Sequence, residues 1–242
     1  MRVSWSLGHW LPLLRTIEDA PASVALSVDD GPTPETTPHL IALLRKFDGR
    51  ATFFLSGVRV VRFPELVAEI VQAGHDVFAH GWEHIRLDRA GAGEPVAAME
   101  KCEALLRAHR PTPAPYLVRL PYGGGYRNPR VHRDLKRWNP SSQMAHYRLS
   151  FHDYLLPPLC PTVEDIPHVC REAVARTLAV GRLPGSILLC HDNPFDVVGE
   201  HKALVTIAVM REVLTALRTR GLTAVPIRQT ARRHAFARFV LV

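Results

Sequence analysis

The sequence predicts a single α/β domain in which strands and helices alternate often enough to close, or nearly close, into a (β/α)7-type barrel. Short apolar, β-branched runs recur along the chain, and helical patterns fill most of the gaps between them. Polar residues of catalytic type follow the apolar runs. Such alternation favours right-handed βαβ units and a parallel sheet. A length of 242 residues suits one core of this kind.

The predicted strands are short and apolar, as parallel strands buried on both faces are. They are VALSV (24–28), ATFFLSG (51–57), HDVFAH (75–80), YLVRL (116–120), MAHYRL (144–149), SILLC (186–190) and LTAVPI (222–227). The predicted helices lie at about 36–47, 64–74, 94–109, 128–137, 164–180 and 201–220. The pattern at 64–74 is typical: it begins with Pro64, places Leu66 and Ile70 on one face and ends at Gly74.

Composition excludes several classes of protein. With 47% hydrophobic and 22% charged residues the chain is neither disordered nor dominated by apolar segments. No window reaches the roughly 18 consecutive apolar residues of a membrane span. The net charge is +7, and the arginines are scattered with denser spots at 127–137 and 228–239. Neither a basic stripe interleaved with exposed aromatic residues nor a known binding module is evident. We therefore expect solvated faces rather than a nucleic-acid partner, although a basic surface can attract an anionic substrate.

Residues 1–22 are interpreted as an N-terminal extension and 23–242 as the domain. The apolar stretch 4–14 is interrupted by His9 and Pro12, which is untypical of a signal peptide, so a cytoplasmic protein is expected. The four cysteines show no CxxC spacing, and we expect free, buried thiols.

Three short segments carry residues suited to metal-assisted hydrolysis. In HGWEH, His80 and His84 lie four residues apart and can share a divalent metal, although this spacing alone is a weak signal. The pair Asp29–Asp30 can supply a third ligand and a base that takes a proton from a metal-bound water, or it can be a solvated turn before Gly-Pro. His191 ends an apolar strand, where it can protonate a leaving amine or merely cap the strand.

Five segments taken in order resemble the motifs of the polysaccharide deacetylases with a NodB homology domain, carbohydrate esterase family 4. SVDDGP (27–32), HGWEH (80–84), RLPYG (119–123), SFHDY (150–154) and LLCHD (188–192) correspond to TFDDGP, H(S/T)xxH, RxPYG, DxxDW and LxHD. The resemblance covers residues 24–192. It implies a distorted (β/α) barrel and a metal-dependent enzyme of carbohydrate metabolism that hydrolyses N-acetyl, or O-acetyl, groups on sugars.

The resemblance also implies roles for individual residues. Asp29 would be the general base, and Asp30, His80 and His84 the metal ligands. Zn²⁺ is the usual metal, with Co²⁺, Ni²⁺ or Mn²⁺ as alternatives. Arg119 would orient Asp29 through a charge-assisted hydrogen bond.

The remaining roles concern the leaving group and the substrate. The backbone N–H of Tyr122 would hold the oxyanion, His191 would be the general acid, and Asp153 would orient His191. Substrate contacts would come from Pro121, Tyr122, Tyr154 and Leu189.

The chain departs from the family motifs at several positions. Gly81 replaces a Ser or Thr whose hydroxyl commonly braces the metal-binding loop, so a looser loop is expected. Ser150 and Tyr154 replace the first Asp and the Trp of the fourth motif, which indicates altered substrate recognition.

Two alternative functions remain open from the sequence. The first is a non-catalytic carbohydrate-binding protein on the same scaffold, because fold does not fix function. The second is a metal-dependent amidase that uses the same residues on a non-sugar amide. The expected partner is an N-acetylated sugar or oligosaccharide, with an anionic form of it consistent with the basic charge.

Overall fold

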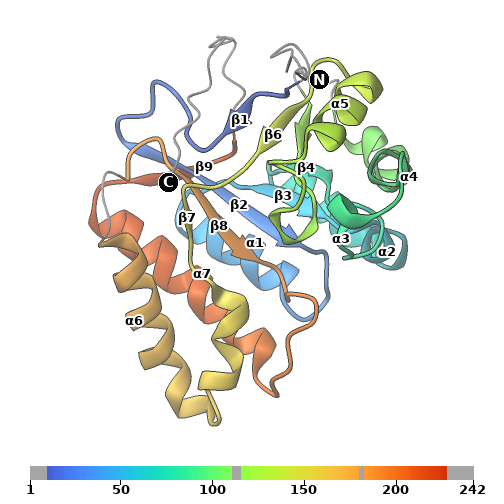
Figure 1. Ribbon diagram of the computed structural model, residues 1–242. Helices are drawn as coiled ribbons and strands as arrows, with labels where there is room; N and C mark the ends of the chain where they lie inside the picture. The colour runs from blue at the N-terminus through green and yellow to red at the C-terminus, as the bar shows by residue number, and fades with distance from the viewer. Residues whose placement is uncertain (1–9, 111–115, 180–182, 228–242) are drawn as a thin grey trace.

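The computed structural model describes residues 10–110, 116–179 and 183–227, and its strands form two parallel sheets (Figure 1). The larger sheet has the order β4-β3-β2-β8-β7, with β9 also paired to β2. Its strands are β2 (Ser23–Asp30), β3 (Thr52–Leu55), β4 (Asp76–Ala79), β7 (Leu149–Ser150), β8 (Ile187–His191) and β9 (Thr223–Val225). The smaller sheet has the order β1-β6-β5 and contains β1 (Leu13–Leu14), β5 (Leu117–Val118) and β6 (Gln143–Ala145).

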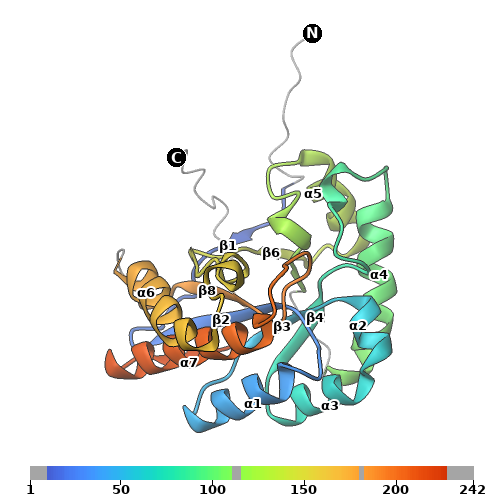
Figure 2. The ribbon, with the colours of Figure 1, turned by 90° about the horizontal axis from the view of Figure 1, so that it is seen from below.

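Helices surround the strands on the outside of this arrangement, and α6 and α7 lie side by side (Figures 1 and 2). The α-helices are α1 (Thr37–Lys46), α2 (Gly57–Arg62), α3 (Pro64–Gln72), α4 (Glu94–Leu106), α5 (Pro129–Trp138), α6 (Ile166–Leu178) and α7 (Lys202–Thr219). Short 3-10 turns occupy Leu87–Arg89, Arg107–His109, Pro121–Gly123, Asp153–Leu155, Pro157–Leu159 and Val163–Asp165. The predicted α/β class and single barrel-like domain therefore agree with the structure.

Strand β2 is the centre of the larger sheet. It pairs with β8 on one edge and with β9 and then β3 along the other, and its residues from Val24 to Asp30 are buried. The apolar residues of β2 therefore contact core on both faces, as the run VALSV predicts. Because all ladders to β2 are parallel, the carboxyl ends of β2, β3 and β8 lie at the same edge of the sheet.

The predicted strand at 144–149 is in fact two strands in different sheets. β6 pairs with β1 and β5, whereas β7 pairs with β8. Between them, the carbonyls of Ala145 and His146 accept hydrogen bonds from the Arg119 guanidinium at 2.9 and 3.0 Å. These carbonyls serve a side chain instead of a neighbouring strand, and the barrel is distorted at this point.

Two small elements were not predicted, because a six-residue helix and a two-residue strand are too short to show a periodicity. They are α2 and β1. β1 lies within the predicted extension 1–22 and pairs with β6, and Thr16 forms a bridge to Ser186. Residues 1–9 and the basic stretch 228–239 lie outside the described residues.

The expected free thiols are confirmed, since Cys102, Cys160, Cys170 and Cys190 are all unpaired and buried. Within the described ranges, no helix combines the length and the hydropathy needed to cross a membrane.

The start of α2 holds the loop HGWEH that follows β4. The N–H groups of Gly57 and Val58 donate to the carbonyls of Gly81 and Trp82 at 3.1 and 3.0 Å, and the Ser56 hydroxyl donates to the Trp82 carbonyl at 3.1 Å. The first N–H groups of a helix have no partner within the helix, so they are free for this contact. Main-chain hydrogen bonds thus secure the loop in which Gly81 carries no hydroxyl.

Gly57 is required where α2 meets this loop, which generates a first prediction. A Cβ at position 57 would overlap the ring of Trp82. We expect Gly57→Ala to lower the free energy of unfolding by about 1–3 kcal/mol, the usual effect of overpacking. Urea unfolding measures this. The matched control is Gly91→Ala, whose Cβ would meet mainly the flexible Glu94 side chain. Equal free energies of unfolding for the two variants would contradict the close packing of Gly57 against Trp82.

Candidate metal centre and active site

Adjacent carboxylates at the end of β2 face the same site because the backbone turns at the second one. Asp29 and Asp30 are 4% and 1% exposed. Successive side chains of a regular strand point to opposite faces, but Asp30 has a φ of 81°, in the left-handed region. Asp residues tolerate this conformation better than most. Both carboxylates consequently approach His80 Nε2, Asp29 Oδ2 at 3.9 Å and Asp30 Oδ1 at 3.5 Å.

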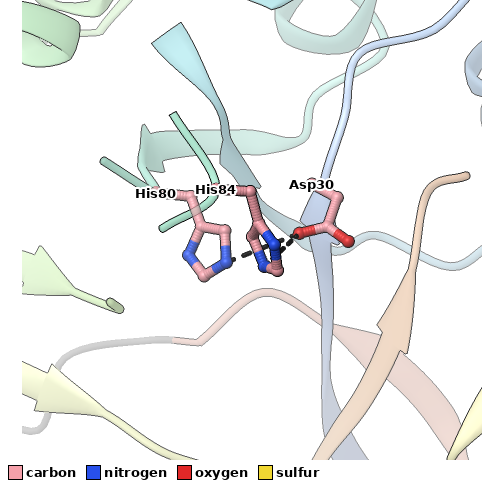
Figure 3. Close-up of side chains that lie close together, drawn as sticks. All are labelled: Asp30, His80 and His84. Atoms are coloured by element: carbon pink, nitrogen blue, oxygen red, sulfur yellow. Dashed lines mark ion pairs between the residues drawn. The ribbon is translucent and has the colours of Figure 1, made fainter. Parts of the chain in front are cut away.

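Asp30, His80 and His84 form a group suited to a divalent metal (Figure 3). One ligand atom from each residue lies within 4.8 Å of the other two. Asp30 Oδ1 is 3.5 Å from His80 Nε2 and 3.4 Å from His84 Nε2. The predicted ligand residues are therefore brought together by the ends of β2 and β4 and the loop that α2 holds.

The surroundings of these atoms fit a cation. Asp30 Oδ1 is buried and has no hydrogen-bond partner among the described residues, and a buried acceptor without a partner is costly. His80 Nδ1 is 2.9 Å from the Arg119 carbonyl, so the N–H donates there and the Nε2 lone pair faces Asp30. Burial lowers the pKa of His80 in spite of both carboxylates, which favours the neutral imidazole that binds metals.

Asp29 pairs with Arg119 instead of joining the metal group. Arg119 Nη1 donates to Asp29 Oδ1 at 2.8 Å and to the Ser27 hydroxyl at 2.6 Å. Burial alone would raise the pKa of Asp29, but the charges of Arg119, His80 and His191 and the Arg119 hydrogen bond outweigh it and lower the pKa. Asp29 is therefore held as an ionised carboxylate with Oδ2 directed toward His80.

His191 stands beside Asp29 on the neighbouring strand, and Asp153 holds it. Asp29 and His191 are register partners of β2 and β8, so their side chains leave the sheet on the same face. Asp153 accepts from His191 Nδ1 and from its backbone N–H, both at 2.7 Å. Burial lowers the pKa of His191, but the charge and hydrogen bond of Asp153, with the charges of Asp30 and Asp29, raise it to about 9.

The residues expected to contact substrate differ in exposure. Pro121 and Leu189 are buried, whereas Tyr122 is 47% and Tyr154 36% exposed. Tyr122 has a left-handed backbone with a φ of 58°, and its ring lies 4.3 Å from that of His84. The ring of Tyr154 meets His191 edge-on at 5.4 Å. The two tyrosines thus flank the candidate ligands on one side and the candidate acid on the other.

Several residues of the site were not identified from the sequence. Asp192 is buried, accepts hydrogen bonds from the hydroxyls of Thr36 and Thr37, and so ties the end of β8 to the start of α1. Burial raises its pKa to about 6 against these hydrogen bonds and the charge of Arg59. Asp192 could have been found from the sequence, because it is the last residue of the motif segment LLCHD. Phe195 and Asp196, which also contact the site, belong to no motif.

Comparisons with known proteins identify the family of the chain. The polysaccharide deacetylase family model matches residues 17–139. Over 117 residues, 47% of this chain, the sequence is 36% identical to the peptidoglycan-N-acetylmuramic acid deacetylase PdaC of Bacillus subtilis, although the match spans only 24% of that protein. It is 27% identical to a chitooligosaccharide deacetylase of a Bradyrhizobium strain, covering 86% of this chain and 90% of that one.

A solved structure shows the same fold. The Bc1960 peptidoglycan N-acetylglucosamine deacetylase superposes with a TM-score of 0.71 at 21% identity, over 94% of this chain and 95% of that one. With the family-model match, the fold and the site define a carbohydrate deacetylase, a hydrolase of non-peptide C–N bonds. The chain belongs to the polysaccharide deacetylase family, as the five motifs indicated.

The contact between Asp153 and His191 generates a second prediction. Asp153→Asn removes the largest charge that raises the His191 pKa and leaves the opposing effect of burial, so the pKa should fall well below about 9. Because the folded-state pKa lies above 6.5, the stabilisation from this pair is complete below pH 6.5 and is lost as the pH rises through about 9.

NMR titration of His191 in the metal-free protein measures the shift directly, and the alkaline limb of the activity profile should move to lower pH with it. Glu164→Gln, on an exposed turn, is the matched charge control. An unchanged His191 titration in Asp153→Asn would rule out the assigned coupling.

Proposed function

We propose that this protein removes N-acetyl groups from a sugar or oligosaccharide by metal-dependent hydrolysis. One observation carries the proposal: Asp29, ionised and held by Arg119, stands between the Asp30–His80–His84 group and His191. A base, a metal group and an acid with its own orienting carboxylate are what amide hydrolysis needs. A protein that only binds sugar has no need of a matched base and acid.

The donor set supports Zn²⁺ as the metal that Asp30, His80 and His84 would hold. Two imidazoles and one carboxylate are the ligands of many catalytic zinc sites, and Co²⁺, Ni²⁺ and Mn²⁺ accept the same donors. When bound, the metal would act as a Lewis acid and acidify a water molecule.

In this proposal Asp29 takes the proton of the attacking water as the water oxygen bonds to the acetyl carbon. Its lowered pKa keeps it ionised at neutral pH. As the C–N bond breaks, His191 donates its Nε2 proton to the leaving nitrogen, while Asp153 holds Nδ1. The immediate products are acetic acid and the amine of the sugar. The acid proton and the proton on Asp29 then pass to the amine and to His191, which gives acetate and an ammonium group and restores both side chains, so atoms and charge balance.

Two further groups have proposed roles in the same step. The backbone N–H of Tyr122, in the turn Pro121–Gly123, would donate to the oxygen that becomes negative. Leu189 and Pro121 would contact the acetyl methyl group, and the exposed rings of Tyr122 and Tyr154 would contact the sugar. Tyrosine suits such a position because its ring is apolar and its hydroxyl is polar.

An acidic group on the substrate is supported by a hollow next to the site. A volume of about 430 Å³ lies against Phe195, whose ring stacks on His84. Arg59 and Arg62 line it, with Glu35 as the acidic residue of the lining. The relatives named above act on peptidoglycan or on chitooligosaccharides. Arg59 holds backbone carbonyls, so the exposed Arg62 would be the group that contacts an acidic sugar.

Two other functions use the same residues. A carbohydrate-binding protein would bind metal without releasing acetate, and a non-sugar amidase would release acid from simple amides. An acetate-release screen of the metal-loaded protein against N-acetyl sugars, O-acetyl sugars, oligomers and simple acetamides separates the three. Release only from sugars is the expected result.

Asp29→Asn should abolish catalysis without loss of metal. We expect acetate release to fall by about 10²–10⁴-fold, the usual contribution of a general base, because the amide cannot take a proton. Zn²⁺ content, measured by elemental analysis, should stay at the wild-type level. Asp30→Asn is the matched comparison, and it should lose metal as well as activity.

A chelator should inactivate the wild type, and added Zn²⁺ or Co²⁺ should restore it. Full activity in Asp29→Asn would rule out Asp29 as the general base. Undiminished activity after complete removal of the metal would rule out metal-dependent hydrolysis.

Arg62→Gln tests the acidic substrate. Arg62 is exposed, and an exposed ion pair contributes up to about 1 kcal/mol, so KM should rise about two- to fivefold for acidic peptidoglycan fragments. KM for neutral N-acetylglucosamine oligomers should not change. Arg107→Gln removes the same charge from another exposed position. Equal changes in KM for acidic and neutral substrates would refute the selective role of the hollow.

A further inference from the structure

The two candidate histidine ligands have different partners on their second nitrogen. His80 Nδ1 donates to a main-chain carbonyl, as described above. His84 Nδ1 is buried and has no hydrogen-bond partner within the described ranges. It faces Asp196 Oδ2 at 3.6 Å. A metal-bound imidazole almost always donates its other N–H to a carboxylate, carbonyl or water, which sets the ring orientation.

Asp196 belongs to a segment of the β8–α7 connection, residues 193–196, that contacts the metal group from the solvent side. The Phe195 N–H donates to Asp30 Oδ2 at 3.3 Å. The Phe195 ring is stacked on His84 with centroids 5.0 Å apart and an interplanar angle of 7°. The Asp196 carboxylate also accepts the Tyr122 hydroxyl. Segment 193–196 therefore contacts two candidate ligands and Tyr122 at once.

Arg59 of α2 fixes segment 193–196 from the opposite side. Its guanidinium lies over the Phe195 ring, 3.7 Å from the centroid, and Nη1 donates to the Asn193 carbonyl at 2.9 Å. Asn193 and Asp196 adopt left-handed φ angles of 53° and 55°, which Asn and Asp tolerate better than most residues. The position of the Asp196 carboxylate is thus set by the conformation of the segment.

We propose that Asp196 is a positioning residue of the metal centre: it accepts the Nδ1–H of His84 and directs Nε2 toward the ion. The inference rests on the proposed metal site. Gly81, inside the metal-binding loop, has no side chain to perform this task. One carboxylate oxygen has two lone pairs and can accept both the His84 N–H and the Tyr122 hydroxyl. Tightening from 3.6 Å to the usual 2.9 Å or so needs a small ring rotation.

Asp196→Ala and Asp196→Asn test the proposal in the 242-residue chain. Asp196 is exposed, so its replacement should not prevent folding, and a thermal melt checks this. Zn²⁺ affinity is measured by competition with a chromophoric chelator, and the Co²⁺ ligand-field spectrum reports geometry. We expect Asp196→Ala to weaken Zn²⁺ binding about 10–100-fold, as loss of such partners does, and to change the Co²⁺ spectrum.

Asp196→Asn should weaken Zn²⁺ binding less, because the amide oxygen still accepts an N–H. Glu200→Ala, which removes an exposed carboxylate from the same connection, should bind Zn²⁺ like the wild type. Wild-type affinity in Asp196→Ala, or an equal loss in Glu200→Ala, would overturn the role of Asp196 alone. Failure of the wild type to bind Zn²⁺ would overturn the proposed metal site and this inference with it.

Discussion

The left-handed backbone at Asp30 is the constraint on which the rest of the site depends. It turns a strand ending in two adjacent carboxylates into a structure that buries both on one side. Two carboxylates on adjacent residues, both buried, repel each other strongly because the dielectric constant of a protein interior is low. The surrounding residues compensate the charges of Asp29 and Asp30 separately.

For Asp29 the balance comes from Arg119. The guanidinium donates through Nε and Nη2 to the carbonyls of Ala145 and His146 and through Nη1 to Asp29, and it lies 4.3 Å from the centroid of the Phe54 ring. A planar group with donors in a fixed fork can make all these contacts together, which an ammonium cannot. Because the accepting carbonyls lie where the chain passes from β6 to β7, the distortion of the barrel and the orientation of Asp29 share one cause.

Much of this arrangement was predictable from the sequence. Parallel strands bring their carboxyl ends to one edge, so Asp29, His80 and His191 could be placed together from the apolar runs that precede them. The resemblance of five segments to family motifs added the proposed roles. The division of 144–149 into β6 and β7 was not predictable. A hydrophobic pattern shows which residues are buried but not which sheet they join, and it does not show that Arg119 binds the carbonyls of Ala145 and His146. Segment 193–196 was not predictable either, because its contacts depend on loop conformation and carry no periodicity.

For Asp30 the balance within the described residues is incomplete. Oδ2 accepts one N–H from Phe195, while Oδ1 is buried without a hydrogen bond and faces two imidazole nitrogens. Leaving such an oxygen unpaired costs about 1–3 kcal/mol, and more when it is charged. Protonated imidazoles could pair with Oδ1, but they would then be buried charges. Burial lowers the pKa of His80 and so opposes its protonation. A divalent cation removes both costs, and a ligand that binds only the folded state stabilises it in proportion to RT ln(1 + [L]/Kd). Metal binding at the proposed site would therefore also stabilise the end of strand β2 through Asp30.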